Sequence, residues 1–330
     1  MISTKERIDL LVQLGEYMKS GNEAWLEIKE RARNRNAWFD AESINMAVQG
    51  ITSRFLEEEL LTEWVNSYPA PKHSVKVGIV MAGNIPLVGF HDFLCGFITG
   101  HSLFIKLSSK DDVLLRHLVD KLIEWQPAVA EQVTFAENLK GCDAYIATGS
   151  NNTARYFEQY FGKYPNIIRR NRTSVAVLTG NESENDLLQL GKDIFSYYGL
   201  GCRNVTKVFL PEGYDVRVLL DGLRPYGDII HHHKYKHNYD YYLAIYLLNK
   251  VPYHTNDFLL MVENKEPFSA VSVLHYGFYT DKAELLECLQ TDDNIQCIVD
   301  NVNIPYGQSQ FPALTDYADD IDTMMFLSAL

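Results

Sequence analysis

The stretch Val75-Lys-Val-Gly-Ile-Val-Met-Ala-Gly-Asn-Ile-Pro-Leu87 decides the fold class, because a short apolar strand runs directly into a turn. Further apolar runs of strand length follow at 103–107, 144–147 and 175–178, and helical patterns lie between them at 87–99, 111–125 and 152–162. Short apolar strands that alternate with helices are typical of a parallel sheet covered on both faces. We therefore expect an α/β fold with the type of sheet that commonly binds dinucleotides.

The sequence on either side of this region predicts further parts. Ser3 and Glu6 have the spacing of a capping box, and apolar residues then recur at helical spacing. A proline-rich break, Tyr68-Pro-Ala-Pro-Lys72, ends this helical pattern, and a second α/β pattern runs from Gly180 to about residue 300. We expect a helical leader at 1–70, a dinucleotide-binding domain at 71–179 that the C-terminal tail 301–330 joins, and a catalytic domain at 180–300.

Composition narrows the class of protein. With 330 residues, 46% apolar and 22% charged, the chain has enough apolar residues to build real cores. The net charge of -13 argues against a general affinity for nucleic acid or anionic membrane, and no run approaches the roughly 20 apolar residues of a membrane span. Five cysteines without a CxxC pair favour a reduced setting. We expect a soluble, cytoplasmic protein without stable membrane insertion.

Cys202 lies in Tyr198-Gly-Leu-Gly-Cys-Arg-Asn-Val-Thr-Lys-Val-Phe-Leu210, where a helical pattern ends in a two-glycine turn and an apolar strand begins. Gly199 and Gly201 permit a tight backbone path, and the charge of Arg203 favours a thiolate. A thiol in such a junction can act as a nucleophile. The alternative is a small buried apolar side chain, which is the role of most single cysteines.

Polar residues follow three of the predicted strands, at the edge where α/β sheets bind ligands. Asn84 can donate to a developing oxyanion, or it can be a turn former beside Gly83. The segment 104–110 can grip a ribose phosphate through its lysines and serines, or it can be a solvated loop. The turn at 148–150 can offer backbone N–H groups to a phosphate, or it can be an ordinary helix cap. No metal-ligand spacing is visible, and His231–His233 favour a polar loop over a metal site.

Five motifs follow one another along the chain: Gly-Asn-Ile-Pro-Leu at 83–87, Ile-Lys-Leu-Ser-Ser at 105–109, Ala-Thr-Gly-Ser at 147–150, Gly-Leu-Gly-Cys at 199–202 and Glu266-Pro-Phe268-Ser-Ala-Val271. Their order resembles the aldehyde dehydrogenase superfamily, and within it the acyl-CoA reductase (LuxC-type) family. The terminal run Tyr306–Asp319 is also similar to that family. The resemblance covers about residues 70–330 and implies an aldehyde dehydrogenase-like fold.

The resemblance implies a role for each position. Cys202 corresponds to the catalytic nucleophile, and Asn84 to the asparagine whose amide forms the oxyanion hole with the cysteine backbone N–H. Implied cofactor contacts are Lys106 to the adenosine ribose, Gly149 and Ser150 to the pyrophosphate and nicotinamide, and Glu266 and Phe268 to the nicotinamide ribose and ring. Glu263, three residues before Glu266, is a second carboxylate in the same stretch.

Two departures from the superfamily pattern change the expected chemistry. Ser109 and Lys110 stand where common NAD-linked members carry a glutamate that binds the ribose diol, so a 2′-phosphate meets a hydroxyl and a cation, and we expect NADPH. Arg169-Arg-Asn-Arg-Thr173 replaces a glutamate-led segment whose glutamate activates water, so hydrolysis of an acyl-enzyme is expected to be slow. The arginines either attract coenzyme A phosphates or form a solvated basic turn.

We therefore expect an NADPH-dependent acyl-CoA reductase that converts a fatty or other acyl thioester to an aldehyde through a Cys202 acyl-enzyme. One alternative is a reductase of an acyl phosphate or acyl-carrier-protein thioester. Another is a catalytically silent subunit that holds an acyl chain or partner in the apolar cleft or on the tyrosine-rich stretch Tyr235–Tyr246. A metal hydrolase ranks last. A homo-oligomer, or a complex with an acyl-transferring partner, is compatible with the sequence.

Overall fold

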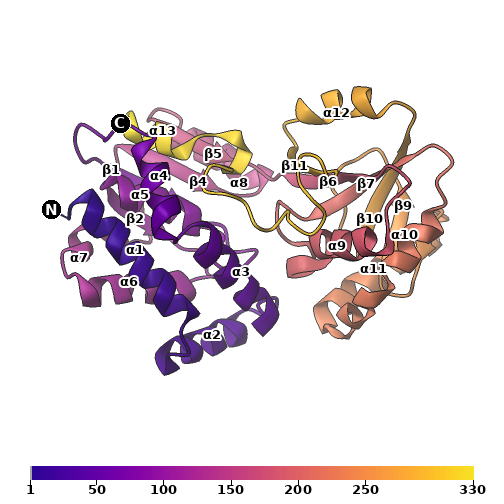
Figure 1. The fold of residues 1–330 in the computed structure, drawn as a ribbon, viewed down its shortest axis with the longest axis horizontal. Coiled ribbons are helices and arrows are strands. Elements are labelled where there is room, and N and C mark those ends of the chain that lie inside the picture. The colour runs from indigo at the N-terminus through magenta and orange to yellow at the C-terminus, as the bar shows by residue number, and fades with distance from the viewer. Residues whose placement is uncertain (1) are drawn as a thin grey trace. The chain divides into compact units, whose positions relative to one another are not determined.

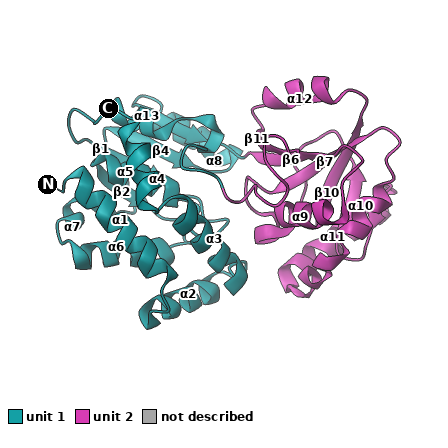
Figure 2. Ribbon diagram, in the orientation of Figure 1, with its two compact units in different colours: residues 1–171, 312–330 teal, residues 172–311 magenta. Residues whose placement is uncertain are grey.

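The computed structural model describes residues 2–330, which form two compact units. Unit 1 contains the residues up to Asn171 together with Pro312–Leu330, and unit 2 contains Arg172–Phe311 (Figure 2). Each unit has one main sheet, and strands and helices alternate along much of the chain (Figure 1). The α/β class expected from the sequence is confirmed.

Unit 1 is built on a five-stranded parallel sheet with the order β3-β2-β1-β4-β5. Its strands are β1 (Lys76–Val80), β2 (Ser102–Lys106), β3 (Val133–Phe135), β4 (Ala144–Thr148) and β5 (Asn166–Arg169). Its helices are α1 (Thr4–Lys19), α2 (Glu23–Arg35), α3 (Ala41–Arg54), α4 (Glu58–Asn66), α5 (Phe90–Thr99), α6 (Leu114–Trp125), α7 (Val129–Gln132), α8 (Asn151–Phe161) and α13 (Thr323–Ser328). The chain leaves β1 in the middle of the sheet toward β2 and returns later to β4, so the strand order reverses beside β1.

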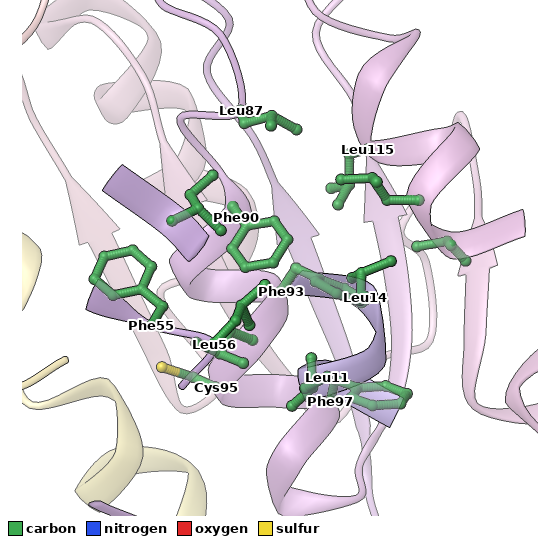
Figure 3. Packing of buried hydrophobic residues seen from close by; sticks show 14 of the residues in the cluster. Leu11, Leu14, Phe55, Leu56, Leu87, Phe90, Phe93, Cys95, Phe97 and Leu115 are labelled. Atoms are coloured by element: carbon green, nitrogen blue, oxygen red, sulfur yellow. The ribbon is translucent and has the colours of Figure 1, made fainter. Parts of the chain in front are cut away.

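The helical leader is part of the unit 1 core. Helix α1 begins with the predicted capping box of Ser3 and Glu6, and it contacts α3, α4, α5 and α6. Its buried Leu11 and Leu14 join Phe93 and Phe97 of α5 in a single cluster (Figure 3). Removing such side chains from a close-packed core costs several kcal/mol each, about 2–5 for a leucine truncated to alanine. The leader therefore stabilises unit 1, which contains the five-stranded parallel sheet.

A buried ion pair links three distant segments of unit 1. Arg169 at the end of β5 donates from Nη1 to both carboxylate oxygens of Asp92 on α5, at 2.7 and 2.6 Å. Its Nη2 donates to Thr323 Oγ1, which opens α13, at 2.8 Å. All three residues are buried. Because a buried charge needs a partner and further hydrogen bonds, this pair fixes the C-terminal helix to the body of unit 1.

Unit 2 is built on a six-stranded sheet with the order β11-β6-β7-β10-β9-β8, in which only the β8–β9 pair is antiparallel. The strands are β6 (Thr173–Val177), β7 (Val205–Pro211), β8 (His254–Thr255), β9 (Leu260–Glu263), β10 (Val273–Tyr279) and β11 (Ile295–Val299). The helices are α9 (Glu184–Phe195), α10 (Val216–Gly222), α11 (His233–Asn249) and α12 (Lys282–Gln290), with 3-10 turns at Ser196–Gly199 and Arg224–His231.

The unit boundary lies before the position expected from the sequence. The boundary expected at residue 179 falls at 171, because β6 pairs with β7 and β11 rather than with the sheet of unit 1. A short apolar strand reads the same in either sheet, and its pairing partner decides where it belongs. The tail divides as well: residues up to Phe311 belong to unit 2, and Pro312–Leu330 belong to unit 1.

Two further findings concern membrane-spanning helices and metal sites. None of the helices among residues 2–330 is long and apolar enough to cross a bilayer. Within the same residues, no three His, Cys, Asp or Glu side chains gather as ligands for a metal ion. The histidine run does not form the polar loop expected from the sequence: His231 ends a 3-10 turn, His232 caps α11 by accepting from Tyr235 N, and His233 begins that helix.

Candidate active site

The carboxyl edge of the unit 1 sheet gathers most of the residues predicted to bind the cofactor. In the parallel register Val80 of β1 lies beside Lys106 of β2 and Ala147 of β4, so the three strands end together. The segments that follow them therefore share one edge of the sheet, as the sequence predicted. This edge carries Lys106, the last residue of β2, and the segments beyond the strands carry Asn84, Ser109, Lys110, Gly149 and Ser150.

The turn that carries Asn84 is held by a neighbouring segment, the loop that follows β2. The backbone N–H of Leu87, which has a φ of 56°, donates to the buried carboxylate of Asp111 at 2.7 Å. Gly83 approaches this neighbour so closely that a Cβ would lie 2.6 Å from Ser108 Oγ. Burial raises the pKa of Asp111 to about 7, although the Leu87 N–H counteracts this. Asn84 itself is exposed on the fixed turn.

The loop after β2 is supported by the leader. Lys106, Ser109 and Lys110 are exposed, so their polar groups are accessible from solvent. Asn36, directly after α2, donates from its side chain to the carbonyl oxygen of Lys110 at 3.2 Å. Arg35 makes an ion pair of 2.9 Å with Asp112 in the same loop. The leader thus positions the loop that carries Ser109 and Lys110, two of the predicted cofactor contacts.

The third segment opens helix α8. Ser150 is the N-cap and accepts from Thr153 N, while Gly149 donates from its backbone to the carbonyl oxygen of Arg169 at 3.3 Å. A Cβ at Gly149 would lie 3.0 Å from Phe157 and 3.1 Å from Thr153, so glycine suits this close turn. The N-terminus of α8 and a residue without a side chain therefore lie together at this edge of the sheet.

Cys202 lies on a tight turn in unit 2, between helix α9 and strand β7. Tyr197, Tyr198 and Gly199 have positive φ values of 50°, 58° and 77° in succession. Left-handed backbone at two tyrosines is costly and persists only where the surroundings enforce it. The residue itself is half-buried, and its carbonyl oxygen accepts from Ser174 Oγ of β6 at 3.0 Å. Cys202 is therefore a partly exposed residue on a backbone that is held in place by its neighbours.

Asn204 is the hub of this turn, and it is fully buried. Its Oδ1 accepts from Gly201 N at 2.7 Å. Its Nδ2 donates to three carbonyl oxygens at the end of α9, those of Asp193, Ile194 and Ser196, at 3.1, 3.4 and 2.8 Å. One side chain thus joins the end of the helix to the residue before Cys202. Sequence reasoning missed this role, although an asparagine two residues after the cysteine was visible.

A second thiol lies close to the Cys202 turn. Cys297 of β11 has its Sγ 3.0 Å from Ser174 Oγ, the same hydroxyl that donates to the Cys202 carbonyl. Burial raises the pKa of Cys297 to about 11, while the charge of Arg203 and the Ser174 hydroxyl oppose the rise. Cys297 is therefore a weak nucleophile at neutral pH.

Glu266 and Phe268 lie in the segment between β9 and β10, also in unit 2. Glu266 is exposed and Phe268 is half-buried. The backbone N–H of Glu266 donates to Asn264 Oδ1 at 3.0 Å. The two predicted nicotinamide contacts therefore lie on one short, internally bonded loop, which ends where β10 begins.

A small hollow of about 20 Å³, with room for about one water molecule, lies beside the Cys202 turn. Tyr198 and Gly199 of the turn line it, together with Tyr235 of α11 and residues 269–273. Tyr235 is almost fully buried, and within residues 2–330 its hydroxyl has no hydrogen-bond partner. Thr206, Ser269 and Ser272 also line this hollow, so its wall is of mixed polarity.

The arginines that replace the usual glutamate segment do not form a solvated basic turn. Arg169 is only 3% exposed and is bonded to Asp92, so the prediction that it attracts phosphates is wrong for this residue. Arg170 is exposed and pairs with Glu158. Arg172 donates to the carbonyl oxygen of Ile295 in unit 2 at 3.2 Å. The three arginines, close together in sequence, thus lie in different surroundings: Arg169 in the core of unit 1, Arg170 at the surface and Arg172 beside strand β11.

Comparison with known proteins agrees with this architecture. No protein-family model matches the chain, and no curated protein sequence matches it. An aldehyde dehydrogenase from Bacillus cereus in complex with NAD+ is 14% identical, with a TM-score of 0.62 over 86% of this chain and 69% of that one. The chain has the aldehyde dehydrogenase fold.

Two further solved structures show the same likeness. An aldehyde dehydrogenase from Mycobacterium tuberculosis complexed with NAD+ is 12% identical, with a TM-score of 0.63 over 86% of this chain and 70% of that one. An NAD-dependent aldehyde dehydrogenase from Sinorhizobium meliloti is 11% identical, with a TM-score of 0.65 over 94% of this chain and 81% of that one. At these identities the likeness concerns the fold, and the expected aldehyde dehydrogenase-like architecture is confirmed.

Proposed function

We propose that this protein is an NADPH-dependent acyl-CoA reductase that works through an acyl-enzyme on Cys202. The observation that supports it most is the half-buried Cys202 on a turn enforced by Asn204 and by left-handed backbone, in a chain with the aldehyde dehydrogenase fold. Strain and buried hydrogen bonds of this kind are typical of functional positions.

In the proposed reaction the Cys202 thiolate attacks the thioester carbonyl carbon, and the negative charge moves to the carbonyl oxygen. The Asn84 amide and a backbone N–H stabilise that oxyanion, which collapses as the bond to the coenzyme A sulfur breaks. The leaving thiolate takes up a proton, and an acyl group remains on Cys202. NADPH, when bound, would supply the hydride that reduces the acyl carbon. Cys202 then departs as a thiolate, and an aldehyde is released.

The cofactor assignment rests on the carboxyl edge of unit 1. A parallel sheet with a switch point beside β1, a glycine turn at Gly149 and the N-terminus of α8 fit a dinucleotide. Ser109 and Lys110 are exposed on the neighbouring loop, where a hydroxyl and an ammonium group suit a 2′-phosphate. Lys106 would contact the adenosine ribose, and Glu266 and Phe268 the nicotinamide end.

The preference for acyl transfer over hydrolysis follows from the segment Arg169–Thr173. This segment contains no glutamate. Arg169 forms an ion pair with Asp92, and the hydroxyl of Thr173 lies 2.6 Å from Thr206 Oγ1. Neither group can act as a general base for water at neutral pH. The acyl-enzyme would therefore persist until hydride or a thiol reaches it.

Intact-mass analysis tests this proposal. The protein is mixed with a panel of acyl-CoA thioesters from acetyl to palmitoyl, first without cofactor and then with NADPH or NADH. We expect an acyl adduct that is lost in Cys202→Ser, kept in the exposed-cysteine control Cys288→Ser, and removed by NADPH with release of aldehyde. If no thioester leaves an adduct, the proposal fails, and an acyl phosphate, an acyl-carrier-protein thioester or a silent binding subunit takes its place.

The oxyanion assignment has its own test. Asn84→Ala should lower turnover by roughly 10²-fold while the protein stays folded, because one preorganised donor is worth about 3 kcal/mol in the transition state. Asn45→Ala changes an exposed asparagine on α3 and serves as the control. Equal turnover in the two variants would remove Asn84 from the mechanism.

A further inference from the structure

Three side chains hold the loop that carries Glu266 and Phe268 through contacts with three consecutive backbone carbonyl oxygens. Lys207 Nζ donates to the carbonyl oxygen of Lys265 at 2.6 Å. His275 Nδ1 lies 2.9 Å from that of Glu266, and because a carbonyl only accepts, this nitrogen carries the proton. Thr206 Oγ1 donates to that of Pro267 at 2.7 Å.

The three side chains come from adjacent strands of the unit 2 sheet. Thr206 and Lys207 lie on β7, and His275 of β10 is the register partner of Lys207. Strand β7 starts three residues after Cys202, so the nucleophile turn and the support of the loop belong to one continuous segment. Three carbonyl groups fixed in succession leave the intervening peptide planes little freedom.

Lys207 is an unusual component of such a support. It is only 5% exposed, and its ammonium group lies 4.7 Å from the centre of the Phe209 ring. Burial lowers the pKa of Lys207, and the charge of Glu266 opposes this. Burying a cation is expensive, and apolar residues of the same volume would fill the strand at lower cost. A purely structural strand position does not require this group.

We propose that Lys207, together with Thr206 and His275, is a positioning residue that sets the Glu266–Phe268 loop for hydride transfer. The inference rests on the proposed function, because it assigns the loop to the nicotinamide end of the cofactor. Acyl transfer to Cys202 needs no cofactor, whereas reduction of the acyl-enzyme does. The clamp, defined as Thr206, Lys207 and His275, therefore governs the second half of the reaction and not the first.

The first test needs no acyl substrate. Lys207→Met keeps the length of the side chain and removes its hydrogen-bond donor. Tyr279→Phe is the control: Tyr279 lies on the same strand as His275, and the substitution removes its hydroxyl, which donates to the carbonyl oxygen of Leu178 at 2.6 Å. We expect amide hydrogen exchange across 264–268 to rise by about 10-fold or more in Lys207→Met only, and NADPH binding to weaken by several-fold, roughly the loss of one charge-assisted hydrogen bond. Unchanged exchange together with unchanged NADPH affinity would overturn the proposal.

The second test separates the half-reactions, with octanoyl-CoA as the first probe and the other thioesters of the panel after it. Acylation of Cys202 should stay within about 2-fold of wild type, while single-turnover NADPH oxidation by the preformed acyl-enzyme falls by about 10-fold or more. If Lys207→Met fails to fold, the comparison is repeated with Thr206→Val, which lacks the hydroxyl, and with Thr206→Ser, which keeps it. A wild-type rate of hydride transfer in Lys207→Met or Thr206→Val, or an equal loss in both half-reactions, refutes the positioning role. If wild type forms no adduct, the proposed function fails, and the exchange and binding measurements still decide whether the clamp holds the loop.

Discussion

Replacement of Asn204 by alanine is the sharpest test of how the Cys202 turn is built. The side chain is fully buried and makes hydrogen bonds to Gly201 N and to the carbonyl oxygens of Asp193, Ile194 and Ser196. Because Nδ2 has two hydrogens, the shortest two of its three contacts count fully. Three buried hydrogen bonds at about 1 kcal/mol each predict a loss of about 3 kcal/mol in the free energy of unfolding of unit 2.

Urea denaturation followed by circular dichroism measures this loss, with hydrogen exchange at Gly201 as the local readout. A loss of about 3 kcal/mol corresponds to roughly 10²-fold faster exchange. Asn204→Asp keeps the acceptor for Gly201 N but points an oxygen at carbonyl groups, so it should destabilise at least as much as alanine.

The matched control is Asn256→Ala. Asn256 is a buried asparagine of the same unit with two hydrogen bonds, to the carbonyl oxygen of Leu220 and from Leu259 N, remote in sequence from the Cys202 turn. It should cost about 2 kcal/mol and leave exchange at Gly201 unchanged. A loss in Asn204→Ala that is below about 1 kcal/mol, or no larger than in Asn256→Ala, would refute the reasoning.

Three further predictions concern buried polar groups. The pKa of Asp111 is about 7 in the folded protein and 3.8 in the unfolded chain, so its contribution to the free energy of unfolding falls as the pH rises from about 4 to about 7, by up to about 4 kcal/mol. Urea denaturation at a series of pH values measures this fall. The fall should be lost in Asp111→Asn and kept in Asp112→Asn. Arg169→Met should cost about 3–5 kcal/mol because it strands the Asp92 carboxylate, and adding Asp92→Leu should recover most of it; no loss in the single variant would contradict the pairing. Tyr235→Phe should change the urea midpoint little or raise it, since the deleted hydroxyl lacks a partner within residues 2–330; a loss above about 1 kcal/mol would show that the hydroxyl is satisfied.

The sequence predicted the strands of the parallel sheet well because each is a short apolar run followed by a turn. The predicted strands at 75–81, 103–107 and 144–147 correspond to β1, β2 and β4 to within a residue or so. The expected gathering of Asn84 and Lys106 at one edge follows from parallel pairing alone. Periodicity identifies such elements because burial on both faces leaves a simple signal.

Other features depend on tertiary partners and left no such signal. The strand at 173–177 belongs to unit 2 because of its pairing with β7, which no local pattern encodes. Arg169 is buried because Asp92, far away in sequence, receives it. Lys207 interrupts the apolar run of β7 with a single charge, and this was the one visible hint of the clamp. The role of Asp111 required knowing that Leu87 adopts a left-handed backbone.

The division of unit 1 into two distant chain segments has a consequence for biosynthesis. The segment up to Asn171 emerges from the ribosome first, yet Arg169 receives its Thr323 contact only after the whole of unit 2 has been translated. Unit 2 is continuous in the chain and can complete its own sheet without waiting. The earlier-made part would therefore remain a partner for chaperones until the last helix, α13, arrives. A nascent chain stalled before Pro312 should display a protease-sensitive first unit beside a resistant second one.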